Sequence, residues 1–172
     1  MYKVGDLVVY GNTGVCRVTE IAERSPKEAG EEQLFYVLKP LYQNCTIFTP
    51  VNNPKVLMRP IITRNEAERL IDMIPAIHAE IYHCRITNKL AEHYNELLKT
   101  SDCLDLLKLC KPLYTKKRIL EKENRKFGTV DERFMKRAEE LLFGELAAAL
   151  DIDKEQVPAY IAERMGKKGR KG

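Results

Sequence analysis

The sequence lacks the motifs that mark the common classes of enzyme. It contains no Walker A loop, no GxSxG nucleophile elbow and no HExxH helix. One group of residues could be imagined as metal ligands, namely His78, His83, Cys84 and His93, but their spacings match no common zinc pattern. We therefore expect no enzyme, no metal and no other cofactor, and we interpret the chain as a binding protein.

Long apolar runs and cysteine motifs are also missing. No hydrophobic run approaches the roughly 18 residues that a membrane-spanning helix needs. The five cysteines are an odd number, include no CxxC pair and follow no secretory signal. Because reduced thiols are typical of the cytosol, the sequence predicts a soluble, cytoplasmic protein with no membrane partner.

Charge is nearly balanced over the whole chain but not along it. The formal net charge is only +4 for 172 residues, so bulk charge is weak evidence for nucleic acid. The segment from Lys108 to Lys126, however, contains eight basic residues and only two acidic ones. Through Ile62, seven basic and six acidic residues nearly cancel. The later part of the chain is therefore a candidate for phosphate contacts, whereas the N-terminal part favours a protein partner.

The N-terminal 62 residues have the pattern of a small β module. The runs Leu7–Tyr10 and Val15–Glu23 flank the segment Gly11-Asn12-Thr13-Gly14, which predicts a hairpin because Gly and Asn tolerate positive φ. Further strands are expected at Leu34–Leu38, Thr46–Thr49 and Val56–Met58. Several short strands at close spacing favour a closed or nearly closed barrel with an exposed edge strand.

From Thr63 onwards the pattern is helical. Thr63 and Glu66 have capping-box spacing, and the same spacing recurs at Thr129 and Glu132. Pro112 predicts a kink or two shorter helices within the basic region. The remaining helices are expected at Ile86–Lys99, from Cys103 after an N-cap in Thr100-Ser101-Asp102, and at Lys154–Met165.

These patterns together predict an α+β protein with two domains. Residues 1–62 are expected to form a small β-barrel, and residues 63–165 an all-helical domain. Residues 166–172 are rich in Gly, Lys and Arg and predict a basic, disordered tail.

Three groups of basic residues in the helical part are candidates for DNA contact. Lys116, Lys117 and Arg118 belong to the basic run, and Arg85 and Lys89, one turn apart, form a second basic spot. A third group is Arg133, Lys136 and Arg137. Basic residues along a helix suit phosphate contacts, which give affinity without sequence choice. The alternative is a solvated helix face, and convergence of the groups in space would favour DNA.

Several segments resemble the CarD-type bacterial transcription regulators. The opening Val4–Val15 (VGDLVVYGNTGV) resembles the start of that family. The match continues through Tyr36–Lys39, Thr46–Val51, Leu113–Lys117, Asp131–Phe134, Ala138–Ala147 and Val157–Ile161. The order of these segments covers nearly the whole chain, to about Glu163.

The resemblance implies a function in transcription. It implies a Tudor-like N-terminal domain that binds the β subunit of RNA polymerase, and a helical domain that contacts promoter double-stranded DNA near the upstream edge of the transcription bubble. Together the two would alter the stability of the open complex. We expect a monomer that reaches the nucleoid through RNA polymerase.

Residue roles follow from the resemblance position by position. Arg24 matches a basic residue that some relatives use at the polymerase contact. A second such arginine falls at Phe48, so the contact here would be apolar or would use a neighbour, and Ile47 is included as a candidate. Arg133 matches a basic position used for DNA contact, and Arg85 and Lys89 lie in the corresponding region.

Many relatives also insert a tryptophan into the minor groove, but this chain has none. Tyr82 and His83 are the nearest candidates for that role. Because a smaller wedge offsets less of the cost of unstacking a base step, we expect weaker bubble stabilisation than in tryptophan-bearing relatives.

Two other functions are compatible with the sequence. A protein–protein adaptor would use the helices to bind protein and leave the basic run solvated, and its binding would depend little on salt. An RNA-binding barrel is disfavoured by the nearly neutral charge of the β module.

Overall fold

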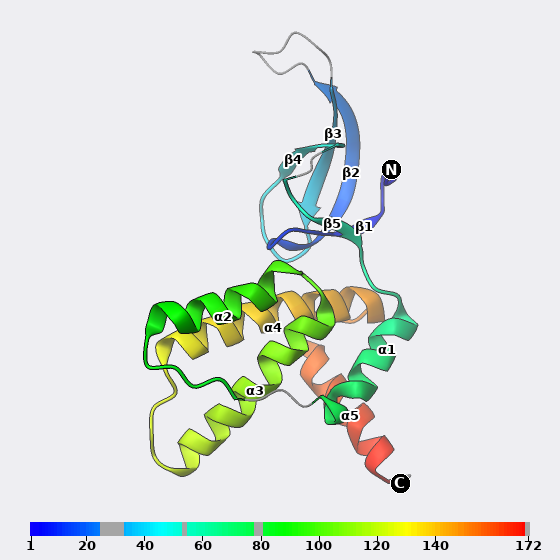
Figure 1. Ribbon diagram of the computed structural model, residues 1–172. Helices are drawn as coiled ribbons and strands as arrows, with labels where there is room; N and C mark the ends of the chain where they lie inside the picture. The colour runs from blue at the N-terminus through cyan, green and yellow to red at the C-terminus, as the bar shows by residue number, and fades with distance from the viewer. Residues whose placement is uncertain (25–32, 53–54, 78–80, 171–172) are drawn as a thin grey trace. The chain divides into compact units, whose positions relative to one another are not determined.

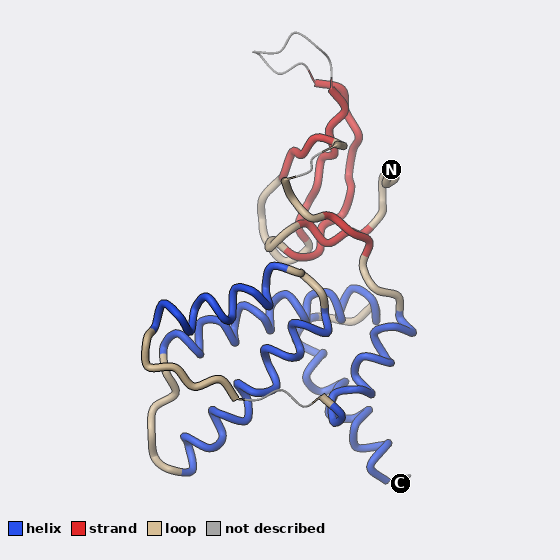
Figure 2. The backbone as a smooth tube through the Cα atoms, viewed as in Figure 1, coloured by secondary structure: helices blue, strands red, loops and turns tan. Residues whose placement is uncertain are grey.

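A computed structural model describes residues 1–24, 33–52, 55–77 and 81–170. The chain divides into two compact units, Met1–Ile61 and Ile62–Gly172. The first is built from strands and the second from helices (Figure 1, Figure 2). The predicted α+β class is confirmed.

The N-terminal unit is a five-stranded antiparallel sheet with the strand order β4-β3-β2-β1-β5. Its strands are β1 Leu7–Tyr10, β2 Gly14–Arg24, β3 Gln33–Pro40, β4 Ile47–Pro50 and β5 Met58–Pro60. The first hairpin forms as the sequence predicts, because Gly11 and Gly14 adopt φ values of 47° and 101° between strands that pair from Tyr10 and Gly14 onwards. β5 begins two residues later than predicted, where Met58 pairs with Tyr10.

The sheet is not closed, so the predicted barrel is not confirmed. Within the described residues, β4 pairs with β3 alone and β5 pairs with β1 alone. Both edge strands are short and end in proline, Pro50 and Pro60, and proline has no N–H with which to extend a ladder. β4 is therefore an edge strand of an open sheet.

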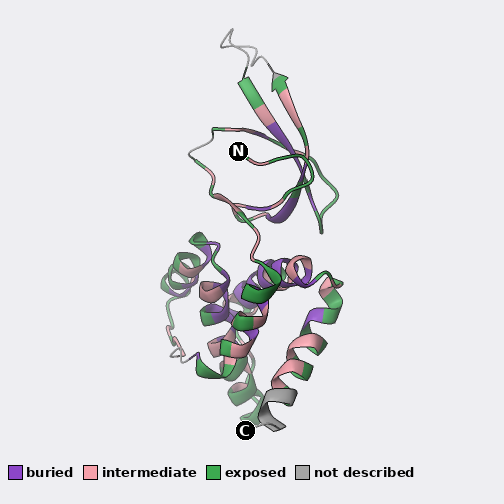
Figure 3. Cartoon of the chain, turned by 90° about the vertical axis from the view of Figure 1, so that its right-hand side faces the viewer, coloured by how far each residue is buried: buried purple, intermediate pink, exposed green. Residues whose placement is uncertain are grey.

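One end of the long β2–β3 pair carries the core of this unit. Val8, Cys16, Val18, Tyr36 and Leu38 are buried together, whereas the residues near Glu23 and Gln33 are exposed (Figure 3). The sheet unit thus has a small apolar core and a two-stranded arm that extends beyond it.

The helical unit contains five α-helices and two 3₁₀ turns among the described residues. They are α1 Arg64–Met73, η1 Ile74–Ala76, α2 Thr87–Lys99, α3 Cys103–Lys122, α4 Thr129–Leu150, η2 Lys154–Gln156 and α5 Val157–Arg170. The predicted capping box of α1 is confirmed: Glu66 N donates to Thr63 Oγ1 at 3.1 Å, and Thr63 N donates to Glu66 Oε2 at 3.3 Å. Asp102 caps α3 through Leu104 N at 2.7 Å.

Three helix boundaries differ from the predictions. α3 continues through Pro112 as one helix, so the alternative of two shorter helices is wrong, whereas a kink at Pro112 stays a prediction. Leu109 and Leu113 on either side are buried, and their packing offsets the lost backbone hydrogen bond. Gly128, not Thr129, is the N-cap of α4. α5 extends to Arg170, beyond the predicted helix end at Met165, since Lys and Arg are good helix formers and are favourable near a helix C-terminus.

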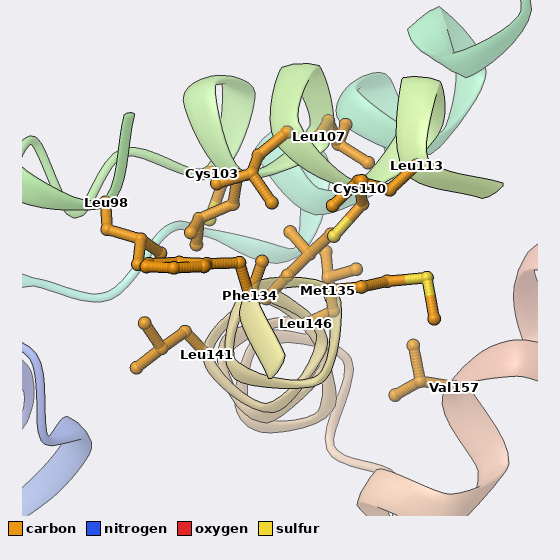
Figure 4. Close-up of a cluster of buried hydrophobic side chains, with 14 of the residues drawn as sticks. Leu98, Cys103, Leu107, Cys110, Leu113, Phe134, Met135, Leu141, Leu146 and Val157 are labelled. Carbon is orange, nitrogen blue, oxygen red and sulfur yellow. The ribbon is translucent and has the colours of Figure 1, made fainter. Parts of the chain in front are cut away.

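The core of the helical unit is built around α4 (Figure 4). Phe134, Met135, Leu141 and Leu146 of α4 are buried, and Val157 of α5 is buried near the end of this row. Residues of α2 and α3 complete the cluster, including Leu98, Cys103, Leu107, Cys110 and Leu113. Stability of the helical unit therefore depends on the apolar stripe of α4.

Replacing a central residue of this stripe should destabilise the helical unit. Leu146 is only 1% exposed, so Leu146→Ala leaves a cavity and should lower the free energy of unfolding by about 3 kcal/mol. Urea unfolding followed by far-ultraviolet circular dichroism measures the change. Ile119→Ala, at an exposed position of α3, is the control and should change the stability by less than about 0.5 kcal/mol. Equal effects of the two variants would contradict this assignment of the core.

Candidate functional site

An exposed aromatic side chain lies on the edge strand of the sheet. Phe48 in β4 is 46% exposed and pairs with Val37 of β3. Ile47, its neighbour, is half-buried and packs against the small core of the sheet unit. Because successive side chains of a strand point to opposite faces, the two residues belong to different faces. Phe48 is therefore the residue of this pair that a partner can contact directly, and Ile47 holds β4 in place.

Arg24, the third residue of the predicted protein-docking site, ends β2. Its backbone pairs with Gln33 at the far end of the β2–β3 pair. Its side chain lies outside the described part of the chain. Of the predicted protein-docking site, the structure therefore describes the side chains of Ile47 and Phe48 at the β4 edge, but not that of Arg24.

One buried carboxylate joins three helices of the helical unit. Asp131, in the first turn of α4, is 3% exposed and accepts a hydrogen bond from the hydroxyl of Tyr94 in α2. It also pairs with Lys116 of α3, with 2.6 Å between Lys116 Nζ and Asp131 Oδ2. A buried charge is tolerated only when it is paired and hydrogen-bonded, and Asp131 has both kinds of partner. We call Asp131, Tyr94 and Lys116 the Asp131 cluster.

The ionisation of Tyr94 agrees with its role as a donor. Burial raises the pKa of the Tyr94 phenol well above its usual value, and the neighbouring Asp131 carboxylate raises the pKa further. The hydroxyl therefore stays protonated at neutral pH and donates to Asp131. The Tyr94 ring also lies 5.3 Å from the ring of Phe134, which packs the start of α4 against α2.

Four exposed basic residues lie on the helices that the Asp131 cluster joins, or just before them. α2 and α4 begin at the same end of the helical unit, and the second half of α3 leads towards that end (Figure 1). Arg85 is exposed just before α2 and Lys89 in its first turn, Arg118 is exposed on α3, and Arg133 is exposed in α4. The guanidinium of Arg133 lies 5.0 Å from the ring of Phe134. We call this end of the helical unit, with Arg85, Lys89, Arg118 and Arg133, the basic end.

Not every lysine of the basic run is available for a ligand. Lys116, predicted to contact DNA, has only 11% of its side chain exposed and neutralises Asp131. Lys111 donates to the carbonyl oxygens of Ile74 and Ile77 at 2.6 and 2.7 Å, so it anchors the segment after α1. Lys117 lies 5.8 Å from the Phe127 ring. Lys116 and Lys111 therefore have structural roles, and the local charge excess overstates the charge that can meet phosphate.

The two candidates for a minor-groove wedge have different environments. The Tyr82 ring stacks on His93 of α2, with 4.0 Å between ring centroids and 14° between planes, and Tyr82 is half-buried. The carbonyl of Tyr82 lies 3.4 Å from Lys116 Nζ. His83 is exposed. Tyr82 is thus packed into the helical unit, and His83 is the more accessible of the two.

Sequence reasoning missed Asp131, Tyr94 and His93. Asp131 falls within a segment whose spacing predicts a capping box, and nothing in the local sequence shows that its carboxylate turns inward to Lys116. From the sequence alone, Tyr94 was interpreted only as part of an apolar helix face. His93 was considered only as a metal ligand, with a spacing that fits no common pattern. A lysine and an aspartate that pair across 15 residues, on different helices, have no local sequence signal.

Metal-binding and membrane-spanning features are not found in the described ranges. No group of three or more His, Cys, Asp or Glu residues there is arranged to hold a metal ion, and His78 lies outside them. No helix in the same part of the chain is long and apolar enough to cross a membrane. The five cysteines are free, and burial raises the pKa of the Cys16 thiol to about 11, so it stays protonated.

The open sheet with an aromatic residue on its edge strand is a module suited to docking another protein. Comparison with known families identifies it more closely. Residues 2–62 match the family model of the CarD-like/TRCF RID domain. These residues are therefore similar to a CarD-like RNA polymerase-interacting domain, in agreement with the resemblance seen in the sequence.

Loss of the lysine in the Asp131 cluster should destabilise the helical unit. Lys116→Met removes the charge but keeps the apolar stem, so Asp131 is left buried without its cation, and we expect a loss of about 3 kcal/mol in the free energy of unfolding. Urea unfolding measures it. Lys122→Met, at an exposed position near the end of the same helix, is the matched control and should have little effect. Wild-type stability of Lys116→Met would show that the ion pair does not hold the three helices together.

Proposed function

We propose that this protein is a non-catalytic transcription regulator that binds the β subunit of RNA polymerase through its sheet unit. Its helical unit binds promoter double-stranded DNA near the transcription bubble and so modulates the stability of the open complex. The observation that carries the proposal is the match of residues 2–62 to the CarD-like/TRCF RID domain. The basic end of the helical unit supports the DNA-binding half.

The geometry of the sheet unit supports docking at β4. β4 lies at the edge of the open sheet, and edge strands can accept a partner strand. Phe48 adds a large, half-exposed aromatic side chain at that edge, and such side chains are common anchors of protein interfaces. The nearly neutral charge of this unit agrees with a protein partner rather than with nucleic acid.

The geometry of the helical unit supports phosphate contacts. The Asp131 cluster fixes the start of α4 against α2 and α3, and the exposed side chains of Arg85, Lys89, Arg118 and Arg133 belong to these helices or to the residues just before them. Arginine and lysine on a rigid scaffold bind phosphates and position a protein on the duplex, but they read little sequence. We therefore infer binding that depends on DNA backbone and bubble structure more than on base sequence.

The packing of Tyr82 affects how strongly this side chain can stabilise the transcription bubble. To enter a base step, Tyr82 would have to leave its stack on His93, which adds to the cost of unstacking the DNA. His83 is exposed but smaller. The inferred effect is modest stabilisation of the open complex, with most DNA affinity coming from phosphate contacts.

A charged residue in place of Phe48 should weaken polymerase binding. Phe48→Glu puts a carboxylate into an apolar contact, so we expect the dissociation constant for a purified polymerase β-subunit fragment to rise about tenfold or more. Calorimetry or biolayer interferometry with the full chain measures it.

Leu57→Glu is the matched control, because Leu57 is also exposed but precedes β5 at the opposite edge of the sheet. Its binding should stay close to that of the wild type. Equal losses in both variants would place the contact elsewhere on the sheet unit, and wild-type binding of Phe48→Glu would contradict docking at β4.

Salt dependence distinguishes phosphate contacts from an apolar protein contact. Affinity for a promoter duplex should fall steeply with salt, and the double change Arg85→Ala and Lys89→Ala should reduce the slope of log K against log salt by about 2. Fluorescence anisotropy at several salt concentrations measures the slope.

Arg69→Ala is the control, since Arg69 is exposed on α1, away from the start of α2 (Figure 1). It should leave the slope unchanged. Undetectable DNA binding at low salt by a folded protein would instead favour the adaptor function, in which the helices bind protein.

A further inference from the structure

The segment just before α2 has no helix or strand, so its position depends on individual contacts. Residues 81–86 lead into α2, and His83 and Arg85 among them are exposed. Tyr82 and Cys84 are half-buried and pack against the apolar core of the helical unit. Inward and outward side chains thus alternate here, and one of the outward ones, Arg85, belongs to the basic end.

Tyr82 is held at two points, both within the helical unit. Its ring stacks on the ring of His93 in α2, with 4.0 Å between centroids and 14° between planes. Its carbonyl oxygen accepts from Lys116 Nζ of α3 at 3.4 Å, and the same amine pairs with Asp131 at 2.6 Å. The ring contact and the main-chain contact therefore come from different helices, and the second one connects this segment to the Asp131 cluster.

The stack on His93 requires the chain to fold back along α2. Because α2 begins at Thr87, His93 lies about 9 Å further along the helix axis, whereas Tyr82 precedes the helix. A segment that continued the axis backwards could not bring the two rings together. In Figure 1 this segment runs beside α2 before it turns into the helix. The stack thus holds the segment alongside α2, with Arg85 between its two ends.

We propose that His93 is a positioning residue, and that its stack with Tyr82 holds Arg85 ready for contact with phosphate. The proposal rests on the function proposed above, because it concerns the binding of DNA by the basic end. Tyr82 is then an anchor that stays packed against the protein, not a wedge that enters the DNA.

The physical basis is the cost of ordering a side chain when it binds. A complex that immobilises a mobile side chain loses affinity, and preorganisation removes part of that loss. Arg85 lies three residues after Tyr82 in the same irregular segment, so freeing Tyr82 frees the backbone that carries Arg85. A freed arginine can still reach the duplex, so the number of phosphate contacts stays the same. Loss of the stack should therefore weaken DNA binding without changing its salt dependence.

The first test measures the affinity of full-length variants for a promoter duplex at several salt concentrations. His93→Ala removes the ring, and we expect the dissociation constant to rise about fivefold with an unchanged slope of log K against log salt. His93→Phe keeps a ring for Tyr82 and should restore the wild-type affinity, which separates stacking from the charge and polarity of imidazole. Asn95→Ala, at another exposed position of α2, is the control and should bind like the wild type.

The second test follows the segment in the free protein. Backbone order parameters from ¹⁵N relaxation are about 0.85 in rigid segments and below about 0.6 in flexible ones. His93→Ala should lower the values of His83 and Arg85 towards about 0.6 and leave those of α3 unchanged. A merely structural role of His93 would instead lower the thermal stability of the helical unit, with no change confined to this segment.

Four results would overturn the proposal. If the wild type binds DNA with a steep salt dependence and His93→Ala binds equally well, the anchor is wrong and the DNA-binding function stands. If His93→Ala lowers the slope and His93→Phe does not restore it, His93 itself contacts phosphate. If His93→Ala prolongs the lifetime of a promoter open complex, Tyr82 is a wedge that His93 holds back. If the wild type does not bind DNA at low salt, both the anchor and the DNA-binding function are wrong.

Discussion

The arrangement of the helical unit depends on the pairing of Asp131 with Lys116 and Tyr94. A carboxylate that is 3% exposed cannot remain charged without partners, and here the partners come from two other helices. Satisfying one charge therefore fixes the start of α4 against α2 and α3 at the same time. The exposed basic residues of the basic end are attached to these helices, so their relative placement follows from a buried interaction that touches no ligand.

A second buried carboxylate has the corresponding role at the other end of α4. Glu145 binds the main chain at Ile62, where the helical unit begins. The same helix thus organises the proposed DNA-contacting end through Asp131 and the entry of the chain through Glu145. The other buried residues of this helix are largely apolar. Both oxygens of each carboxylate have a partner within the helical unit.

Much of the fold could be predicted from local patterns, and what was missed depends on distant residues. The Gly11–Gly14 hairpin and the Thr63–Glu66 capping box are short-range devices, and both were predicted correctly. The barrel was not confirmed, because closure depends on whether two distant short strands meet. At Pro112 a kink or two shorter helices were expected, because the local cost of proline is visible in the sequence. The burial of Leu109 and Leu113, which keeps the helix in one piece, is not visible there.

The same limit applies to the candidate site. Phe48 was predicted as a contact from the resemblance and is exposed, and its role stays a prediction. Lys116 was grouped with surface lysines because its partner Asp131 is on another helix. The most direct test of bridging is the dissociation rate of a promoter open complex, measured with increasing full-length protein. The account predicts a saturable change in that rate, lost both in Phe48→Glu and in the double variant Arg85→Ala, Lys89→Ala. No change in the rate, or a change that survives loss of either surface, would contradict it.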